Sequence, residues 1–491
     1  MKRKRKLTSN NVDSFSNAEK IKNFFKLFAN RKVIVSIFIT LVILIIFRIG
    51  SLVSMPGVKF ISSTAAVNDL QSNNLLGLMN MLGGGGLTQV SIFALGVSPY
   101  INAQIIMQLL STDLVKPISD MLKSGEAGKR KYEIWTRVIT LPFAFLQAYA
   151  IIALLTTSKL HTVIEFNDNN PLTSSQWAFY IFLLVGGCYA SIFLGDVITK
   201  RGVGNGITLI IATGIIGSLI TDFQIAQEVL TSISSSSTAV FFTHEISFVL
   251  YIIFFFVIIM IIVFMNESVR KIPVQQTGQG MINEKENIHY LPIKVNAAGV
   301  IPIIFAASLM SIPSTVQIFY PTTSVAYQVI QNYFTFESWL GICIYLVLTI
   351  LFTFFYSYVQ INPERQAENF KKSGKFILGV QSGEETEKYI SRILMRVNFI
   401  GAPFLAILAS IPYFVGKAIG LPFSDSALGG TGMIIIVAVC LQTWLSIKSA
   451  ATSINYGKVR KEIEYSASVF QPDVEVVTKQ KKDNNNSKLL W

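Results

Sequence analysis

The sequence has few charged residues, and this shortage decides its broad class. Only 14% of its 491 residues are charged, whereas 51% are apolar and the mean hydropathy is positive. A typical soluble domain carries about 25% charged residues, so a soluble globular protein of this length is excluded. The composition indicates a chain that crosses a membrane several times.

Cysteine and histidine are also rare. Cys188, Cys343 and Cys440 lie singly inside apolar runs, and the three histidines lie singly between such runs. None of these residues has the spacing of a metal site, and the sequence has no catalytic triad, no paired carboxylates on one helix face and no G-x-x-x-x-G-K phosphate loop. We therefore expect no metal, no cofactor and no catalytic residue, and we do not expect an enzyme.

Ten apolar runs are long enough to cross the roughly 30 Å hydrocarbon core of a bilayer. They are unbroken rather than alternating, as in VIVSIFITLVILIIF, which favours helices over the strands of a barrel and predicts an all-α membrane protein. No cleavable signal peptide is expected, because the basic N-terminus leads directly into a full-length span. The predicted spans are residues 33–54, 90–112, 136–157, 176–197, 205–222, 246–266, 298–320, 338–361, 395–416 and 430–448.

Lysine and arginine alternate between the two sides of this arrangement. They are abundant in the N-terminus, in every second loop and after the last span, whereas the other five loops hold only Lys59, Lys159 and Lys417. The positive-inside rule then predicts a multi-pass protein of the cell membrane with both termini in the cytoplasm. The formal net charge of +13 is explained by this topology and by attraction to anionic lipid, or else by docking of a charged partner such as a ribosome or a motor protein.

Charge inside the spans is nearly absent. Arg48 and Asp196 lie near span ends, where they can reach the interface or pair locally. The polar residues within the second span are neutral, and such a stripe suits either a helix contact or a wetted wall. They are Ser98, Asn102, Gln104 and Gln108.

The spans divide into two groups of five around the loop at 223–245. Since each half has an odd number of spans, any structural repeat must be inverted in the membrane, with a site or pore at the interface of the halves. The predicted organisation is a basic N-terminal segment (1–31), a first half (32–222), an external hinge loop (223–245), a second half (246–450) with cytoplasmic loops at 267–297 and 362–394, and a cytoplasmic tail (451–491).

The sequence also contains several longer characteristic phrases: FRIGS (47–51), MPGV (55–58), SIFALGVSPYINAQIIMQLL (91–110), GEAGKRK (125–131), RGVGNGITLIIATGI (201–215), KIPVQ (271–275), LPIKVNAAGVIPIIFAASL (291–309), NPERQAENFKKSGKFILGV (362–380) and GGTGMIIIV (429–437). In these phrases the chain resembles the SecY family of protein-translocation channels, from about residue 30 to about 450.

This resemblance implies a re-entrant plug at residues 73–89 that seals the channel from the outer side. Glycine supplies the backbone freedom to enter and leave the membrane, and such irregular backbone must be enclosed by protein. The plug residues implied are Leu75, Leu76, Leu78, Met79, Met81, Gly83, Gly84, Gly85 and Gly86.

The resemblance also implies a constriction of bulky aliphatic side chains, which we call the pore ring. Its members would be Val97, Ile101, Ile207, Ile211, Ile304 and Ile435. Two pairs of these positions are four residues apart, so each pair shares one helix face. An apolar ring can gate by dewetting and can yield around a passing chain without binding it.

A lateral gate is implied between residues 91–108 and 298–312. Pro99 and Pro302 are expected to remove helical hydrogen bonds there and to dispose the helices to bend. Asn102, Gln104 and Ser308 are expected to form contacts across the seam that break when a signal sequence enters.

Two loops depart from the family pattern. Gln381 stands where relatives usually have an arginine, and the loop tip around 277–289 has mixed charge instead of a basic hairpin. These loops meet a SecA-type motor or the ribosome in the family, so fewer cations should weaken contact with acidic surfaces or rRNA phosphate. The candidate contacts are Arg270, Lys271, Arg365, Lys371, Lys372, Lys375 and Gln381.

The function implied is a passive protein-conducting channel. Unfolded secretory preproteins with signal sequences would cross the membrane, and hydrophobic segments would leave sideways into lipid. The resemblance implies SecE-like and SecG-like subunits as well as a SecA-type motor or a ribosome. The alternative is a secondary transporter with a five-plus-five inverted repeat, which would require carboxylates at mid-membrane depth.

Overall fold

The computed structural model describes most of the predicted membrane part of the chain. The described residues are 31–60, 90–111, 115–156, 164–166, 173–231, 238–276, 289–317, 320–321, 324–335, 338–419 and 432–450. The expected plug, the loop tip at 277–288 and the predicted C-terminal tail lie outside the described residues.

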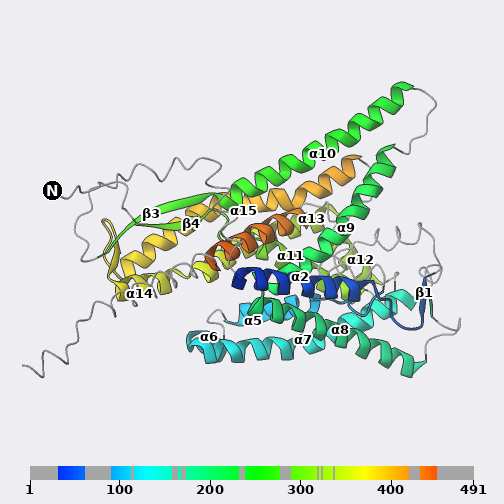
Figure 1. Ribbon diagram of the computed structural model, residues 1–491, viewed down its shortest axis with the longest axis horizontal. Coiled ribbons are helices and arrows are strands. Elements are labelled where there is room, and N and C mark those ends of the chain that lie inside the picture. The colour runs from blue at the N-terminus through cyan, green and yellow to red at the C-terminus, as the bar shows by residue number, and fades with distance from the viewer. Residues whose placement is uncertain are drawn as a thin grey trace, which may run out of the picture.

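Helices occur at all ten predicted positions, and Figure 1 shows most of them running along the long axis of the molecule. In chain order they are α2 (Arg31–Leu52), α5 (Ser98–Ser111), α7 (Gly125–Thr156), α8 (Ser174–Arg201), α9 (Gly206–Thr231), α10 (Thr238–Glu267), α11 (Ile301–Gln317), α13 (Trp339–Ile361), α15 (Glu384–Ile419) and Gly432–Ala450. Shorter helices are α6 (Lys116–Lys123), α12 (Val325–Phe334) and α14 (Pro363–Ser373).

Within the part of the chain that the structure describes, six of these helices are long and apolar enough to cross a membrane: α2, α7, α8, α13, α15 and Gly432–Ala450. Helix α5 has 14 residues, or about 21 Å at 1.5 Å per residue, which is less than the bilayer core. The predicted span at 90–112 is therefore helical only in its second part.

The outward faces of the helices are apolar, which is the reverse of a soluble protein. On α10 the exposed side chains recur at helical spacing, and Met260 is 76% exposed. The exposed stripes are Ile34, Phe38, Leu41, Ile45 and Ile49 on α2, and Val249, Ile253, Phe256, Met260 and Phe264 on α10. Large uncharged apolar faces of this kind fit lipid rather than water.

The interior of the bundle is one continuous hydrophobic cluster to which every long helix contributes. Buried hydroxyl groups within it are mostly satisfied by their own helix. Thr349 donates to the Tyr345 carbonyl oxygen at 2.8 Å, and Thr353 donates to the Thr349 carbonyl oxygen at 2.6 Å. Such back-bonding lets a polar side chain lie in an apolar core without a partner from another helix.

Strands also occur, and the all-α prediction did not include them. β1 (Val58–Phe60) pairs antiparallel with β2 (Ile164–Phe166). β3 (Val269–Gln276) lies between β4 (His289–Lys294) and β5 (Lys375–Ile377) in an antiparallel sheet. Two loops that are about 80 residues apart in the chain are therefore joined in one sheet.

This sheet has a hydrophobic core of its own. Together with α14 and residues 384–397 of α15 it forms what we call the sheet module, at the left end of the molecule in Figure 1. The buried members of this core are Ile272, Val274, Ile293, Ala297, Phe370, Ile377, Ile390, Ile393, Leu394 and Val397. In β3 the buried Ile272 and Val274 alternate with exposed Lys271 and Pro273, which is the pattern of a half-buried strand.

The sheet module is tied to the bundle at the start of α11. Only six residues separate β4 from α11, and within them the Asn296 amide donates to Asn266 Oδ1 at 2.8 Å. Asn266 belongs to the last turn of α10, so the ends of α10, β4 and α11 are held together.

Truncation of the module core should loosen this unit locally. Ile390 is fully buried in the core of the sheet module, and Ile390→Ala is expected to cost about 2–5 kcal/mol because it leaves a cavity. Hydrogen exchange of the β3 and β4 amides should accelerate, while exchange in α2 should not change.

Met395→Ala is the matched control, because Met395 lies on the same helix and is 59% exposed. Equal exchange in both variants would contradict the assignment of a separate module core.

Candidate functional site

Five of the six predicted pore-ring residues belong to the hydrophobic core of the bundle, and the sixth, Ile207, packs against it. Val97 immediately precedes α5, and Ile101 is in its first turn; Ile207 and Ile211 are in α9, Ile304 is in α11 and Ile435 is in Gly432–Ala450. All are buried at 5% exposure or less except Ile207, which is partly buried against the same cluster. All six therefore lie inside the bundle or against its core, and their arrangement as a ring stays a prediction.

Residues 90–97 form an irregular segment directly before α5. Successive turns are closed by Ala94 donating to Ser91 at 2.9 Å, Gly96 to Phe93 at 2.8 Å and Ser98 to Leu95 at 3.3 Å, all through backbone groups. Most of the segment is buried. Irregular backbone at membrane depth requires such enclosure, because lipid offers no hydrogen-bond partners.

The prediction that Pro99 and Pro302 each remove an intrahelical hydrogen bond and dispose their helices to bend is wrong. Helix α5 begins at Ser98 and α11 begins at Ile301, so each proline is the second residue of its helix. The missing proline N–H costs nothing there, because the first N–H groups of a helix have no intrahelical partner. The interior proline of α11 is Pro313, which the sequence analysis did not single out.

Helices α5 and α11 pack against each other, as the lateral-gate prediction requires. Asn102 on α5 is 1% exposed and Ser308 on α11 is fully buried. Neither the Asn102 amide nor the Ser308 hydroxyl has a hydrogen-bond partner among the described residues. Unlike Thr349, these polar atoms are not satisfied by their own helix, and Gln104 is only partly buried.

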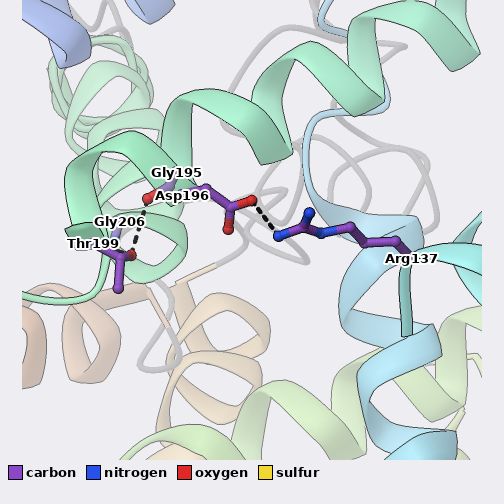
Figure 2. A network of polar contacts seen from close by, with 5 residues as sticks. All are labelled: Arg137, Gly195, Asp196, Thr199 and Gly206. Atoms are coloured by element: carbon purple, nitrogen blue, oxygen red, sulfur yellow. Dashed lines mark hydrogen bonds and ion pairs between the residues drawn. The ribbon is translucent and has the colours of Figure 1, made fainter. Parts of the chain in front are cut away.

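Asp196, predicted to pair locally near a span end, forms an ion pair with Arg137. Arg137 Nη2 lies 2.6 Å from Asp196 Oδ2, with side chains 37% and 24% exposed (Figure 2). The Tyr189 hydroxyl also donates to the Arg137 carbonyl oxygen at 2.8 Å. These contacts join α7 to α8 near the end of α8. Arg48, the other charged residue, lies close to Gly217 of α9.

The phrase RGVGNG forms the tight turn between α8 and α9. The Thr199 hydroxyl accepts from the Gly206 N–H at 2.8 Å and donates to the Gly195 carbonyl oxygen at 2.9 Å (Figure 2). The Thr40 hydroxyl of α2 accepts from the Val203 N–H at 3.0 Å. Side-chain oxygens therefore satisfy backbone donors that the turn would otherwise leave unpaired.

The predicted partner-contact cations gather in the sheet module. Arg270 and Lys271 lie on β3, Arg365, Lys371 and Lys372 on α14, and Lys375 on β5. Lys375 is partly buried and the other five are exposed. Only Lys372 has an ion pair within the described part of the chain, at 2.8 Å from Glu368, and this lysine lowers the pKa of the Glu368 carboxyl.

Gln381 lies exposed in the turn before α15. Its N–H donates to Glu385 Oε2 at 3.3 Å and its carbonyl oxygen accepts from the Thr386 hydroxyl at 2.7 Å. The first turn of α15 contains Glu384, Glu385 and Glu387, which suit the positive end of the helix dipole. The surface around Gln381 is therefore acidic where relatives of the resembled family usually have an arginine.

The described residues contain no group of three or more histidine, cysteine or acidic residues that could hold a metal ion. The fold and the site instead define a polytopic helical membrane protein with a buried aliphatic cluster at the meeting of several helices. A family model described as SecY matches residues 91–444. The chain belongs to the SecY family.

Two similar proteins are the protein translocase subunits SecY of Mycoplasmoides gallisepticum and Mycoplasma pneumoniae. They are 48% and 47% identical over 89% of this chain, and the matches cover 86% and 90% of their own lengths.

Three solved structures share the fold at low sequence identity. One is a protein-conducting channel (TM-score 0.60, 17% identity) and another concerns the plug domain of the SecY protein (TM-score 0.58, 17% identity). The third is Sec61 in the canine ribosome–channel complex from the endoplasmic reticulum (TM-score 0.57, 16% identity). Each match covers 85% of this chain and 92% of the other.

The ion pair between α7 and α8 should show energetic coupling. Arg137→Gln or Asp196→Asn alone leaves a half-buried charge without its partner, so each is expected to destabilise the protein by about 1–2 kcal/mol. The double variant should lose less than the sum of the two, because no unpaired charge remains. Thermal unfolding of all four proteins in one detergent measures the coupling, and additive losses would show that the pair contributes none.

Proposed function

We propose that this protein is the protein-conducting channel of a translocase and that its pore ring seals the resting channel. The observation that carries the proposal is the burial of Val97, Ile101, Ile211, Ile304 and Ile435 in the core of the bundle, with Ile207 packed against it, in a chain that belongs to the SecY family. Such a ring excludes water and ions by dewetting, and it can widen around a polypeptide without offering it hydrogen bonds. The channel itself then supplies no chemistry, and the energy for transport comes from a partner.

The seam between α5 and α11 is the proposed exit for hydrophobic segments. Asn102 of α5 and Ser308 of α11 are buried without hydrogen-bond partners in the described part of the chain, and an unsatisfied buried polar group costs about 1–3 kcal/mol. These groups therefore make the closed seam less stable than an apolar seam would be. Opening gives them access to water or to the backbone of an entering signal sequence.

The segment at 73–89 is the proposed plug, acting from the outer side of the pore ring. Its support is the resemblance of the flanking residues to the family and the similar fold of a structure that concerns a SecY plug domain. The glycine-rich residues 83–86 supply the backbone freedom for its displacement.

The sheet module is the proposed docking surface for the energy source. Arg270, Lys271, Arg365 and Lys371 are exposed there without ion pairs in the described part of the chain, so they are free to contact acidic side chains or rRNA phosphate. The similar Sec61 structure is a ribosome–channel complex, which supports ribosome docking. A SecA-type motor, SecE-like and SecG-like subunits and signal-bearing preproteins complete the proposed set of partners.

The proposed location is the cytoplasmic membrane, with the sheet module and both termini on the cytoplasmic side. The loops on that side carry the Lys and Arg excess, as the positive-inside rule requires. A transporter is the less favoured function, because Asp196 lies near the end of α8 and is already paired with Arg137.

Crosslinking tests the pore assignment directly. A photoreactive probe at Ile101 or Ile304 should crosslink to a stalled, labelled preprotein in membranes, and the crosslink should disappear when the preprotein lacks its signal sequence. A probe at Met260, which lies on the exposed face of α10, is the control and should not react. If Ile101 and Ile304 also fail to react although the protein inserts normally, the pore assignment is wrong and solute uptake should be measured instead.

The polar seam generates a second prediction. Asn102→Leu and Ser308→Ala remove unsatisfied buried atoms and should stabilise the closed seam by about 1–2 kcal/mol each, a roughly 5–30-fold shift toward the closed state. Membrane insertion of weakly hydrophobic signal sequences should fall more than insertion of strongly hydrophobic ones.

Thr315→Val is the matched control for the seam, because Thr315 is equally buried on α11 but its hydroxyl is bonded to the Ser311 carbonyl oxygen. If insertion of weak signal sequences falls no more than insertion of strong ones in any of the three variants, the polar groups of the seam play no part in opening.

A further inference from the structure

We propose that Gly195 and Thr199 on α8 are positioning residues that set the place of Ile207, and through it the tightness of the resting channel. This inference rests on the proposed function, because it treats Ile207 as part of the pore ring.

The Thr199 hydroxyl links the end of α8 to the first residue of α9. It accepts a hydrogen bond from Gly206 and donates one to Gly195, so a single oxygen ties both backbones together (Figure 2). Gly206 is buried, and Ile207 is the next residue. The hydrogen bond therefore acts one residue away from a predicted ring member.

The helices also cross at backbone contact at this place. A Cβ atom at position 206 would overlap the Gly195 carbonyl oxygen, so a side chain at 206 would force α8 and α9 apart. A Cβ atom at position 195 would lie 3.1 Å from Ile207 Cγ1 and 3.4 Å from Ile210 Cδ1. Ile207 therefore packs directly against the backbone of Gly195, which has no side chain to keep it away.

Helix α8 is also held by α7. Asp196, the neighbour of Gly195, is paired with Arg137 of α7, while Thr199 faces the start of α9 (Figure 2). The end of α8 is consequently linked to both α7 and α9. Because its contact with α7 holds α8 in place, its contact with α9 sets where α9 begins.

The same turn also reaches the helix that carries Ile435. A Cβ atom at Gly204 would lie 3.3 Å from Thr443 Oγ1, and Thr443 belongs to Gly432–Ala450. Gly204 has a φ of +82°, a backbone conformation that glycine adopts without strain. The turn therefore lies against two helices that contribute to the pore ring.

Two matched pairs of variants test the proposal. Thr199→Val keeps the shape but loses the hydrogen bonds, whereas Thr199→Ser keeps the hydroxyl. Gly195→Ala pushes on Ile207, whereas Gly186→Ala adds the same methyl group to the same helix where no atom lies within 4 Å. The Gly195→Ala change is small enough to keep the proposal testable if Thr199→Val does not fold.

Two readouts are needed. The first is the labelling rate of Ile207→Cys by a water-soluble maleimide, in a protein whose Cys188, Cys343 and Cys440 are replaced by serine. The second is the chloride leak of the resting channel in planar bilayers. Thr199→Val should raise both by roughly tenfold, the factor that one lost hydrogen bond to a buried donor represents. Gly195→Ala should also raise both, because its methyl group displaces residue 207. Thr199→Ser and Gly186→Ala should raise neither.

The outcomes separate this inference from the proposed function. If the parent crosslinks to a preprotein through Ile101 but labelling and leak are the same in all four variants, the positioning role is wrong. Faster labelling without leak, or leak without faster labelling, overturns it as well, because the seal would not depend on where Ile207 lies. A parent that makes no preprotein crosslink refutes the channel proposal itself.

Discussion

The structure depends on one constraint: within lipid, each backbone N–H and C=O group must find its partner inside the protein. Long helices meet it by themselves. The irregular segment 90–97 meets it through its own turns and through burial, and the turn after α8 meets it through the hydroxyls of Thr40 and Thr199. At the turn after α8, the bonds that satisfy irregular backbone therefore also link neighbouring helices.

The ten helices were predictable because a helix that faces lipid requires a long apolar run, and such runs can be read directly from the sequence. Their ends were not, because hydropathy records contact with lipid and not the extent of a helix: α7 and α15 each begin 11 residues before their predicted spans. The sheet also escaped prediction, since the pairing of Val274 with Ile377 joins segments about 100 residues apart. Short strands in polar loops carry too little local pattern to reveal such a partner.

The candidate site was predictable in composition but not in detail. The spacing of Ile207 and Ile211 and the family resemblance placed the aliphatic residues, and five of the six lie in the core, with Ile207 packed against it. Pro99 and Pro302 were misinterpreted because a proline in an apolar run gives no sign of whether a helix starts at it or passes through it. The link between Thr199, Gly206 and Gly195 left no sequence signal, since it depends on two helices crossing at bare backbone.

The three-stranded sheet restricts how this protein can diverge. Since β3 and β4 come from one loop and β5 from another, the two loops share a register and cannot change length independently at their paired residues. Insertions and deletions can accumulate only where the strands are not paired, above all between Gln276 and His289, where the family departure in sequence is found. New partner preferences can therefore arise by exchange of this one hairpin tip while the strands that carry it are conserved.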